Sequence, residues 1–198
     1  MSTPLPRVAL RPARPARAPR LAEIIAAAEA IVDSEGPDAL TMRRLAADLG
    51  IQAPSLYKHL AGRDELVALL VEDALFDVGD ACHAALDRPG RRTPVAALLV
   101  AYRRLAQDRP HRYRLATGAG LRRELLAPGL EAWAGEPFYR AAGEPHTAQA
   151  LWGFAHGMVA LELDQRFLPG SDLDRTWRSG AAAFSTRSNR PTATAARR

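Results

Sequence analysis

The chain has 198 residues, 47% of them hydrophobic and 25% charged, so it can enclose a hydrophobic core and is not typical of a disordered chain. Its longest unbroken apolar stretch, residues 95–102, is far shorter than a bilayer requires, and no signal-peptide core follows the N-terminal arginines, so we expect a soluble, cytoplasmic protein. The formal net charge is +5, and the single cysteine, Cys82, excludes an internal disulfide and a zinc site built from thiolates.

The charge is distributed unevenly along the chain. Residues 1–20 hold five arginines and no acid, residues 187–198 hold four arginines and no acid, and residues 21–186 hold 18 basic and 22 acidic groups. Repeated prolines in residues 4–19 exclude a helix there. We therefore predict a flexible basic arm over residues 1–19 and a disordered basic tail over residues 187–198, on either side of an acidic body.

The first half of the body has the apolar spacing of helices. The first predicted helix covers residues 21–33 and ends before Gly36 and Pro37. Thr41 caps a second helix, which extends to Leu49 and is stopped by Gly50. A third covers residues 53–59, and a long fourth covers residues 64–86 with acids within its apolar stripe.

Prolines divide the second half into further helices. Pro94 and Pro110 each begin one. The next region is predicted as two pieces, 121–134 and 137–142, or as a bent helix, because Gly135 and Pro137 interrupt it. A long helix follows over residues 145–168, and Ser171 caps the last one, which ends near residue 185. With no strand alternation anywhere, the predicted fold is all-α with about nine helices.

Residues 40–63 read L-T-M-R-R-L-A-A-D-L-G-I-Q-A-P-S-L-Y-K-H-L-A-G-R, two short helices joined by a glycine turn. This is a helix-turn-helix pattern. Leu45, Ala46, Leu49, Leu56 and Leu60 are predicted to face inward, and Gly50 supplies the positive φ of the turn. The outward face of the second helix then carries hydrogen-bond donors and one aromatic ring, as a surface for a DNA major groove requires.

This segment, with the D-E-L that follows it, resembles the DNA-binding signature of TetR-family transcriptional regulators over residues 21–70. The resemblance implies that Arg43 reaches a base edge or a phosphate, that residues 53–55 touch base edges, and that Tyr57, His59 and Arg63 contact phosphates. Lys58 could touch either. The full set assigned to DNA is Arg43, Ala53, Pro54, Ser55, Tyr57, Lys58, His59 and Arg63. Ala53 departs from a polar base reader, because a methyl group reads only a thymine methyl.

The C-terminal two thirds contain a W-x-x-x-H-G element at residues 152–157, which resembles a class of TetR-family regulatory domains. The domains expected are a helix-turn-helix domain at 20–65 and a ligand-binding and dimerisation domain at 66–186. Small residues at spacings of three and four suggest that a helix-helix interface of a homodimer includes Ala150, Gly153, Gly157 and Ala160. Side chains available to an effector cavity are Phe76, Tyr102, Trp133, Phe138, Trp152 and His156, although each also suits the core.

The function expected from the resemblance is that of a homodimeric repressor, released from an inverted-repeat DNA operator by a small-molecule effector, with no cofactor and no membrane partner. An enzyme is not expected, because no H-E-x-x-H, G-x-S-x-G, C-x-x-C or P-loop motif is present. The alternative is a helical interaction module without specific DNA binding, which Ala53 favours and Arg43, Tyr57, His59 and Arg63 oppose. The arm is either a solubilising tail or a source of added phosphate or minor-groove contacts.

Overall fold

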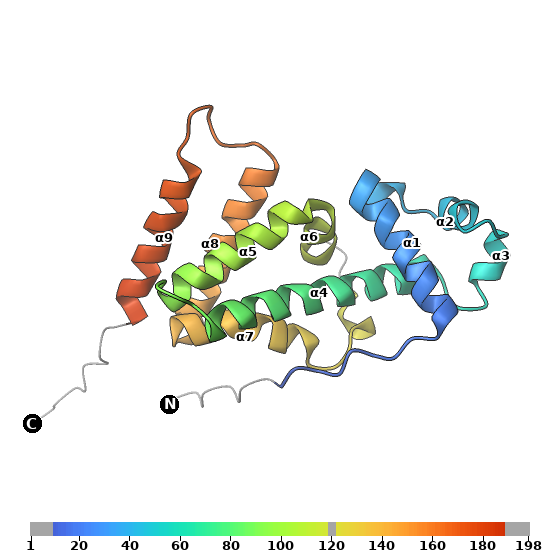
Figure 1. Cartoon of the computed structure of the whole chain (residues 1–198), viewed down its shortest axis with the longest axis horizontal. Coiled ribbons are helices and arrows are strands. Elements are labelled where there is room, and N and C mark those ends of the chain that lie inside the picture. The colour runs from blue at the N-terminus through green and yellow to red at the C-terminus, as the bar shows by residue number, and fades with distance from the viewer. Residues whose placement is uncertain (1–9, 119–121, 189–198) are drawn as a thin grey trace, which may run out of the picture. The chain divides into compact units, whose positions relative to one another are not determined.

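The computed structural model describes residues 10–118 and 122–188, the last three by their backbone alone. Over these residues the chain forms nine α-helices, two short 3-10 helices and no strand, which confirms the predicted all-α fold (Figure 1). None of the helices described is long and apolar enough to cross a membrane. The elements are α1 (Pro19–Glu35), η1 (Pro37–Ala39), α2 (Met42–Asp48), α3 (Ala53–Leu56), α4 (Arg63–Asp87), α5 (Pro94–Asp108), α6 (Pro110–Thr117), η2 (Arg123–Leu125), α7 (Leu130–Ala142), α8 (Pro145–Leu163) and α9 (Leu173–Ser188).

The chain divides into two compact units, residues 1–80 with 104–134 and residues 81–103 with 135–198. The divisions fall inside α4, α5 and α7, and the expected boundary of the DNA-binding domain between residues 65 and 66 stays a prediction. In the first unit α6 packs with α1. There Arg112 of α6 pairs with Glu29 and Asp33 of α1, at nitrogen–oxygen distances of 2.9 and 2.7 Å.

The core of the first unit joins α1 to the helix-turn-helix segment and to the start of α4. Its buried members all carry apolar side chains, and burial of apolar surface is the main source of stability for such a small helical bundle. They are Ile24, Ile25, Ala28, Ile31, Val32, Leu40, Leu45, Ala46, Leu56, Leu60, Leu66 and Leu70. The inward-facing leucines predicted from the sequence lie in or against this cluster, including the half-buried Leu49.

Helix α7 is continuous from Leu130 to Ala142, with Pro137 inside it, so the prediction of two separate pieces is wrong. A proline in a helix removes one backbone hydrogen bond. Burial of the aromatic side chains on both sides of it favours the unbroken helix. Trp133 packs against Phe76 and Phe138 against Tyr102, with ring centroids 5.8 and 5.4 Å apart.

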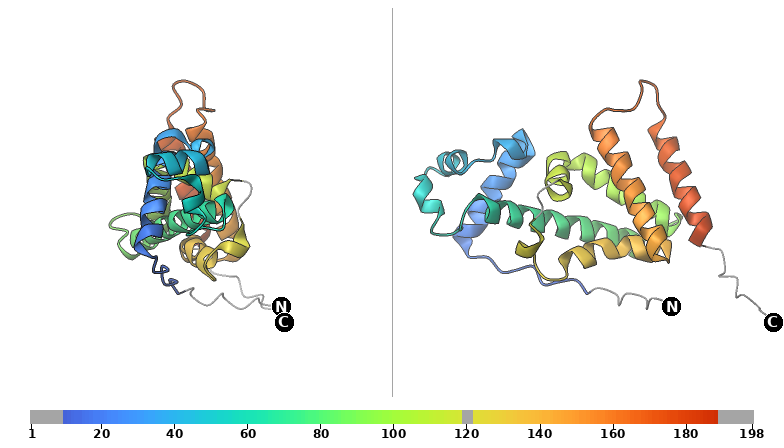
Figure 2. Two further views of the ribbon diagram at one scale, coloured as in Figure 1. Left: turned by 90° about the vertical axis from the view of Figure 1, so that its right-hand side faces the viewer. Right: turned by 180° about the vertical axis from the view of Figure 1, so that it is seen from behind.

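The last two helices differ from their predicted bounds. Helix α8 ends at Leu163 rather than near residue 168, and Gln165 follows it with φ of 52°. Asp172, not Ser171, caps α9 by accepting a hydrogen bond from the Arg175 N–H, and α9 extends to Ser188, two residues into the predicted tail. Helices α8 and α9 lie side by side (Figure 2), at a contact where Phe154 faces Gly180.

Residues 10–18 form an extended segment that leads into α1 (Figure 1). In the first unit this segment lies on α4, where Arg11, Arg14 and Arg17 pair with acidic side chains. A flexible arm was expected here. The acids that hold the segment are more than 50 residues away in sequence, so the local composition gave no indication of them.

Candidate DNA-binding surface

Local hydrogen bonds shape the turn between α2 and α3. Thr41 caps α2, since its Oγ1 accepts from the Arg44 N–H at 3.1 Å, as predicted. At the other end Gly50 has φ of 64°, and the N–H groups of Gly50 and Ile51 donate to the carbonyls of Ala47 and Ala46 at 3.0 and 2.9 Å. This pair of bonds is a Schellman motif, which favours glycine at the left-handed position. The predicted role of Gly50 is thereby confirmed.

The predicted recognition helix is shorter than expected. Helix α3 covers Ala53–Leu56, and residues 57–59 continue it as a turn. Leu56 and Leu60 are buried and fix the inward side of this segment. The outward side exposes Pro54, Tyr57, Lys58 and His59, and Tyr57 has 55% of its surface in solvent. Ala53 and Ser55 are half-buried at its edge.

The cations near this surface differ in what they bind. Arg43 and Lys58 are exposed and form no ion pair with any described residue. Arg44 pairs with Glu35 at 2.7 Å and with Asp48 at 2.9 Å, and these carboxylates raise its pKa further above the ordinary value. Arg43 and Lys58 are therefore available to a phosphate backbone.

Arg63 has a structural contact that the sequence did not reveal. Its Nε donates to the Leu40 carbonyl at 3.1 Å, and its Nη2 lies 3.4 Å from the Pro37 carbonyl. These bonds tie the start of α4 to the segment that precedes α2. Arg63 remains exposed, so its predicted phosphate contact is compatible with this role.

The six side chains predicted to contact an effector are divided between the two units. Phe76 and Trp133 pack together in the first unit, and Tyr102 and Phe138 pack together in the second, all four being buried. Trp152 is half-exposed on α8 and stacks on His156. The hydrophobic core thus holds four of the six, and their role as effector contacts stays a prediction.

The small residues predicted for a dimer interface lie on an open face of α8. Ala150 and Gly153 are exposed, and Gly157 and Ala160 are half-buried. A Cβ atom placed on Gly153 or Gly157 would meet no atom within 4 Å. Trp152 and Leu161 add exposed apolar surface to the helix, so these glycines are not required for close packing inside one protomer.

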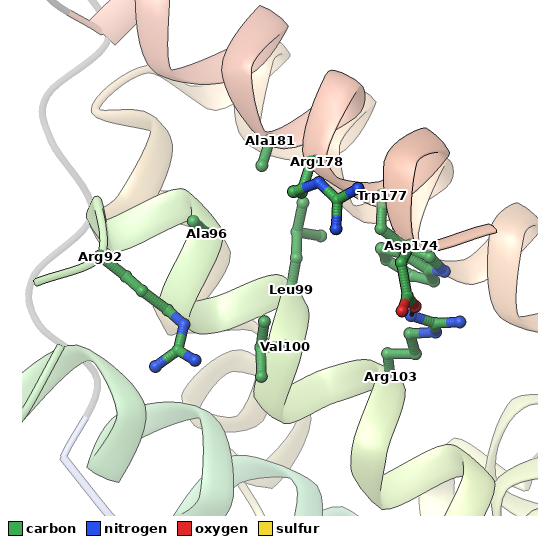
Figure 3. A pocket seen from close by; sticks show the side chains of 9 residues that line it. All are labelled: Arg92, Ala96, Leu99, Val100, Arg103, Asp174, Trp177, Arg178 and Ala181. Atoms are coloured by element: carbon green, nitrogen blue, oxygen red, sulfur yellow. Dashed lines mark hydrogen bonds and ion pairs between the residues drawn. The ribbon is translucent and has the colours of Figure 1, made fainter. Parts of the chain in front are cut away.

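A cavity of about 510 Å³ lies between α5 and α9 in the second unit (Figure 3). Its residues are Arg92, Ala96, Leu99, Val100, Arg103, Asp174, Trp177, Arg178 and Ala181, a set that includes none of the six predicted contacts. Sequence analysis missed it because its two walls are about 80 residues apart in the chain.

One end of this cavity is fixed by a charged network. Arg103 binds Glu162 at 2.5 Å and Asp174 at 2.6 Å, and it lies 5.5 Å above the Trp177 ring. The Trp177 N–H donates to Glu162 at 3.1 Å. The hydrogen bond from Arg103 lowers the pKa of Asp174, so this carboxylate stays ionised. Arg92 and Arg178 also line the cavity (Figure 3).

Comparison with known proteins gives a consistent result over both parts of the chain. Residues 24–70 match the model for bacterial regulatory proteins of the tetR family, and residues 95–184 match the model for the tetracyclin repressor-like C-terminal domain. The HTH-type transcriptional repressor DrrR1 of Streptomyces coeruleorubidus is 37% identical over 102 residues, which are 46% of this chain and 36% of that protein. The chain thus spans only about a third of that relative.

Three further proteins match over most of their length. The uncharacterized HTH-type transcriptional regulator Rv0681 of Mycobacterium tuberculosis is 29% identical over 76% of this chain and 73% of its own. The crystal structure of the regulatory protein SCO4313 is similar with a TM-score of 0.68 and 26% identity, over 83% of this chain and 94% of that one. The multidrug binding protein EbrR, solved with imidazole, shares the fold with a TM-score of 0.64 at 21% identity, over 88% of this chain and 97% of its own.

Proposed function

Because this chain belongs to the tetR family of bacterial regulatory proteins, and is a transcriptional regulator with a helix-turn-helix DNA-binding domain, we propose that it acts as a homodimeric repressor. In this proposal the dimer binds an inverted-repeat operator and leaves it when a small-molecule effector binds. The single observation that carries the DNA-binding part is the exposed side of α3 and its following turn, near Arg43 and Lys58, which form no ion pair with any residue the structure describes.

The exposed side chains suit distinct contacts. Pro54, with the half-buried Ala53 and Ser55, presents small groups to base edges in the major groove. Tyr57 and His59 extend from the turn, where a hydroxyl and an imidazole suit phosphate oxygens. The remaining roles belong to cations: Arg43 and Lys58 reach a base edge or a phosphate, and Arg63 adds a phosphate contact.

The open face of α8 supports the homodimer. Small residues let two helix backbones approach closely, and burial of the exposed Trp152 and Leu161 in an interface would stabilise the dimer. A dimer also meets a physical need, because one short recognition helix contacts too few base pairs to specify a site, whereas two related by a dyad read both halves of a near-palindrome.

Gly157→Arg should block the contact between the α8 helices of two protomers without a clash inside one protomer, since nothing lies near its Cβ position. We expect light scattering to give a dimer mass for the wild type and a monomer mass for this variant.

The cavity between α5 and α9 is the proposed effector site. Its volume falls within the range of about 300–1,000 Å³ found for small-molecule sites. Leu99, Val100 and Trp177 offer apolar contacts, and Arg92 and Arg178 offer positive charge. We therefore expect an effector with an apolar body and an anionic group. Such a ligand releases DNA only to the extent that it binds the DNA-free arrangement of the protein more tightly than the DNA-bound arrangement.

Selection from a library of random duplexes at about 150 mM salt tests the DNA-binding proposal, because this salt concentration weakens nonspecific phosphate binding. The wild-type protein should enrich an inverted repeat, and the exposed-surface double variant Tyr57→Ala, Lys58→Ala should not. Equal thermal stability of the two proteins is the control. Enrichment of no sequence by the wild type would favour the alternative of an interaction module without specific DNA binding.

A further inference from the structure

The segment before α1 has a repeat that matches the geometry of an extended chain. Residues 11–17 read R-P-A-R-P-A-R, with arginine at every third position. A polyproline II helix has three residues per turn, so it places these arginines on one side. Ala18, at the end of the segment, has φ of −58° and ψ of 144°, which are polyproline II values. The arm therefore presents one row of guanidinium groups.

Helix α4 presents the matching row of acids in the same compact unit. Arg11 donates to both carboxylate oxygens of Asp80, at 2.8 and 2.9 Å. Arg14 donates to Asp77 at 3.2 Å. Arg17 donates to Asp73 and to Glu72, the latter at 3.3 Å. The arm runs antiparallel to α4, and each step of three residues in the arm matches a step of about one turn in the helix.

Contacts between the arginines and two aromatic rings add to the ion pairs. The guanidinium carbons of Arg11 and Arg14 each lie 5.0 Å from the centre of the Phe76 ring, and that of Arg11 lies 5.4 Å from the centre of the Trp133 ring. Guanidinium groups at such distances are attracted to the face of a ring. The surface of α4 is thus both acidic and aromatic, which suits arginine better than lysine.

Burial shows which pair anchors the arm. Glu72 and Asp73 are 4% and 6% exposed, and the Arg17 side chain is 13% exposed. Glu72 also accepts from the Ala127 N–H at 2.9 Å, and Asp73 has Arg14 at 3.7 Å. If Arg17 moved to a DNA phosphate, two largely buried carboxylates would lose their closest cation. Removal of one partner from a buried ion pair is strongly unfavourable.

The arm and α6 share an acidic partner on α4. Asp77 accepts from Arg14 of the arm at 3.2 Å and from Arg109, at the start of α6, at 3.0 Å. Arg112 of α6 in turn holds Glu29 and Asp33 of α1. Because α1 follows the arm directly, the arm and α6 fix the two ends of α1 in this unit.

We propose that the acidic and aromatic face of α4 (Glu72, Asp73, Phe76, Asp77 and Asp80) is a binding site for the chain's own Arg-x-x-Arg-x-x-Arg arm. The arm braces α1 against α4, and its arginines stay on α4 when the protein binds DNA. Residues 10–18 are therefore not an extra DNA-contacting segment, which was one of the two interpretations of the arm, and the first nine residues of the arm lie outside the described part of the chain.

Trypsin cleavage tests the docking in the full-length protein. Trypsin does not cut before proline, so within residues 10–18 only the Arg17–Ala18 bond is open to it. We expect this bond to be cut at least tenfold more slowly in the protein than in a synthetic peptide of residues 8–20. The exposed-site variant Asp77→Asn, Asp80→Asn should speed its cleavage several-fold. The matched control, Asp108→Asn, removes an exposed carboxylate that pairs with Arg104 and should change nothing. Cleavage as fast as in the peptide, or no effect of the double variant, would overturn the proposal.

The salt dependence of DNA binding tests the second half of the proposal, with a random-sequence 30 bp duplex as the probe. In the variant Arg11→Gln, Arg14→Gln the slope of log affinity against log salt should equal that of the wild type. If the arm lay on DNA, the slope would fall by about 2 for each protomer. This half rests on the proposed function, and the variant Lys58→Gln distinguishes failure of the arm proposal from failure of the proposed function. Lys58→Gln must lower the slope, and an unchanged slope would contradict the DNA-binding surface. The trypsin test would still decide whether the arm docks on α4.

Discussion

Replacement of Arg17 by alanine should destabilise the whole fold, although the residue lies outside every helix. The side chains of Arg17, Glu72 and Asp73 are 13%, 6% and 8% exposed, so this ion pair is largely removed from water. Loss of one partner from a buried pair costs about 3–5 kcal/mol. Ala127 and Arg14 still support the two carboxylates, so we expect the lower end, about 3 kcal/mol. For a chain of this length the melting temperature should fall by roughly 6–12 °C.

Urea unfolding followed by circular dichroism measures this change, with two controls. Arg20→Ala removes the exposed pair with Glu23 and should cost less than about 1 kcal/mol. The double variant Arg17→Ala, Asp73→Asn also removes one of the two carboxylate charges that Arg17 neutralises. It should therefore be more stable than Arg17→Ala alone. If Arg17→Ala costs no more than Arg20→Ala, the arm does not neutralise a buried acidic pair and the reasoning fails.

Three further predictions concern other parts of the fold. Thr41→Ala removes the cap of α2 and should cost about 1 kcal/mol in urea unfolding, with Thr41→Ser close to wild type. Gly180→Ala would place a Cβ atom 2.1 Å from Phe154 and should lower the free energy of unfolding by about 1–3 kcal/mol. The control Gly135→Ala, with open space at its Cβ, should leave stability unchanged. Equal melting temperatures of the two variants would contradict the close contact of α8 with α9. Burial raises the pKa of the Cys82 thiol to about 12, so a disulfide reagent at pH 8 should label it only in urea, and rapid labelling of the folded protein would show that α4 opens there.

Local signals allowed much of the fold to be predicted from the sequence. Thr41 and Gly50 mark the ends of α2 through bonds made within a few residues, and the apolar spacing identified the buried leucines around them. Pro137 misled because its local preference is outweighed by burial of Trp133 and Phe138. The continuity of α7 therefore depends on tertiary packing, which cannot be read from a single sequence.

The charged contacts were the least predictable. Arg17 meets Glu72 and Asp73 across more than 50 residues, and Arg103 meets Glu162 across 59. The arm's period of three and the acids within the stripe of residues 64–86 were both visible in the sequence. Nothing in either segment showed that they pair. The outward residues of α3 were predictable because the helix-turn-helix pattern itself fixes which side faces the core.

In the proposed function, α3 and its following turn read DNA as one half of a dyad. A hydroxyl-radical footprint on a duplex enriched by the wild-type protein would show this arrangement. We expect two protected patches of equal size, related by a dyad and about 10–17 bp apart between centres. Both patches should vanish together in the Tyr57→Ala, Lys58→Ala variant. A single patch, or protection that survives in this variant, would show that α3 does not read DNA in this way.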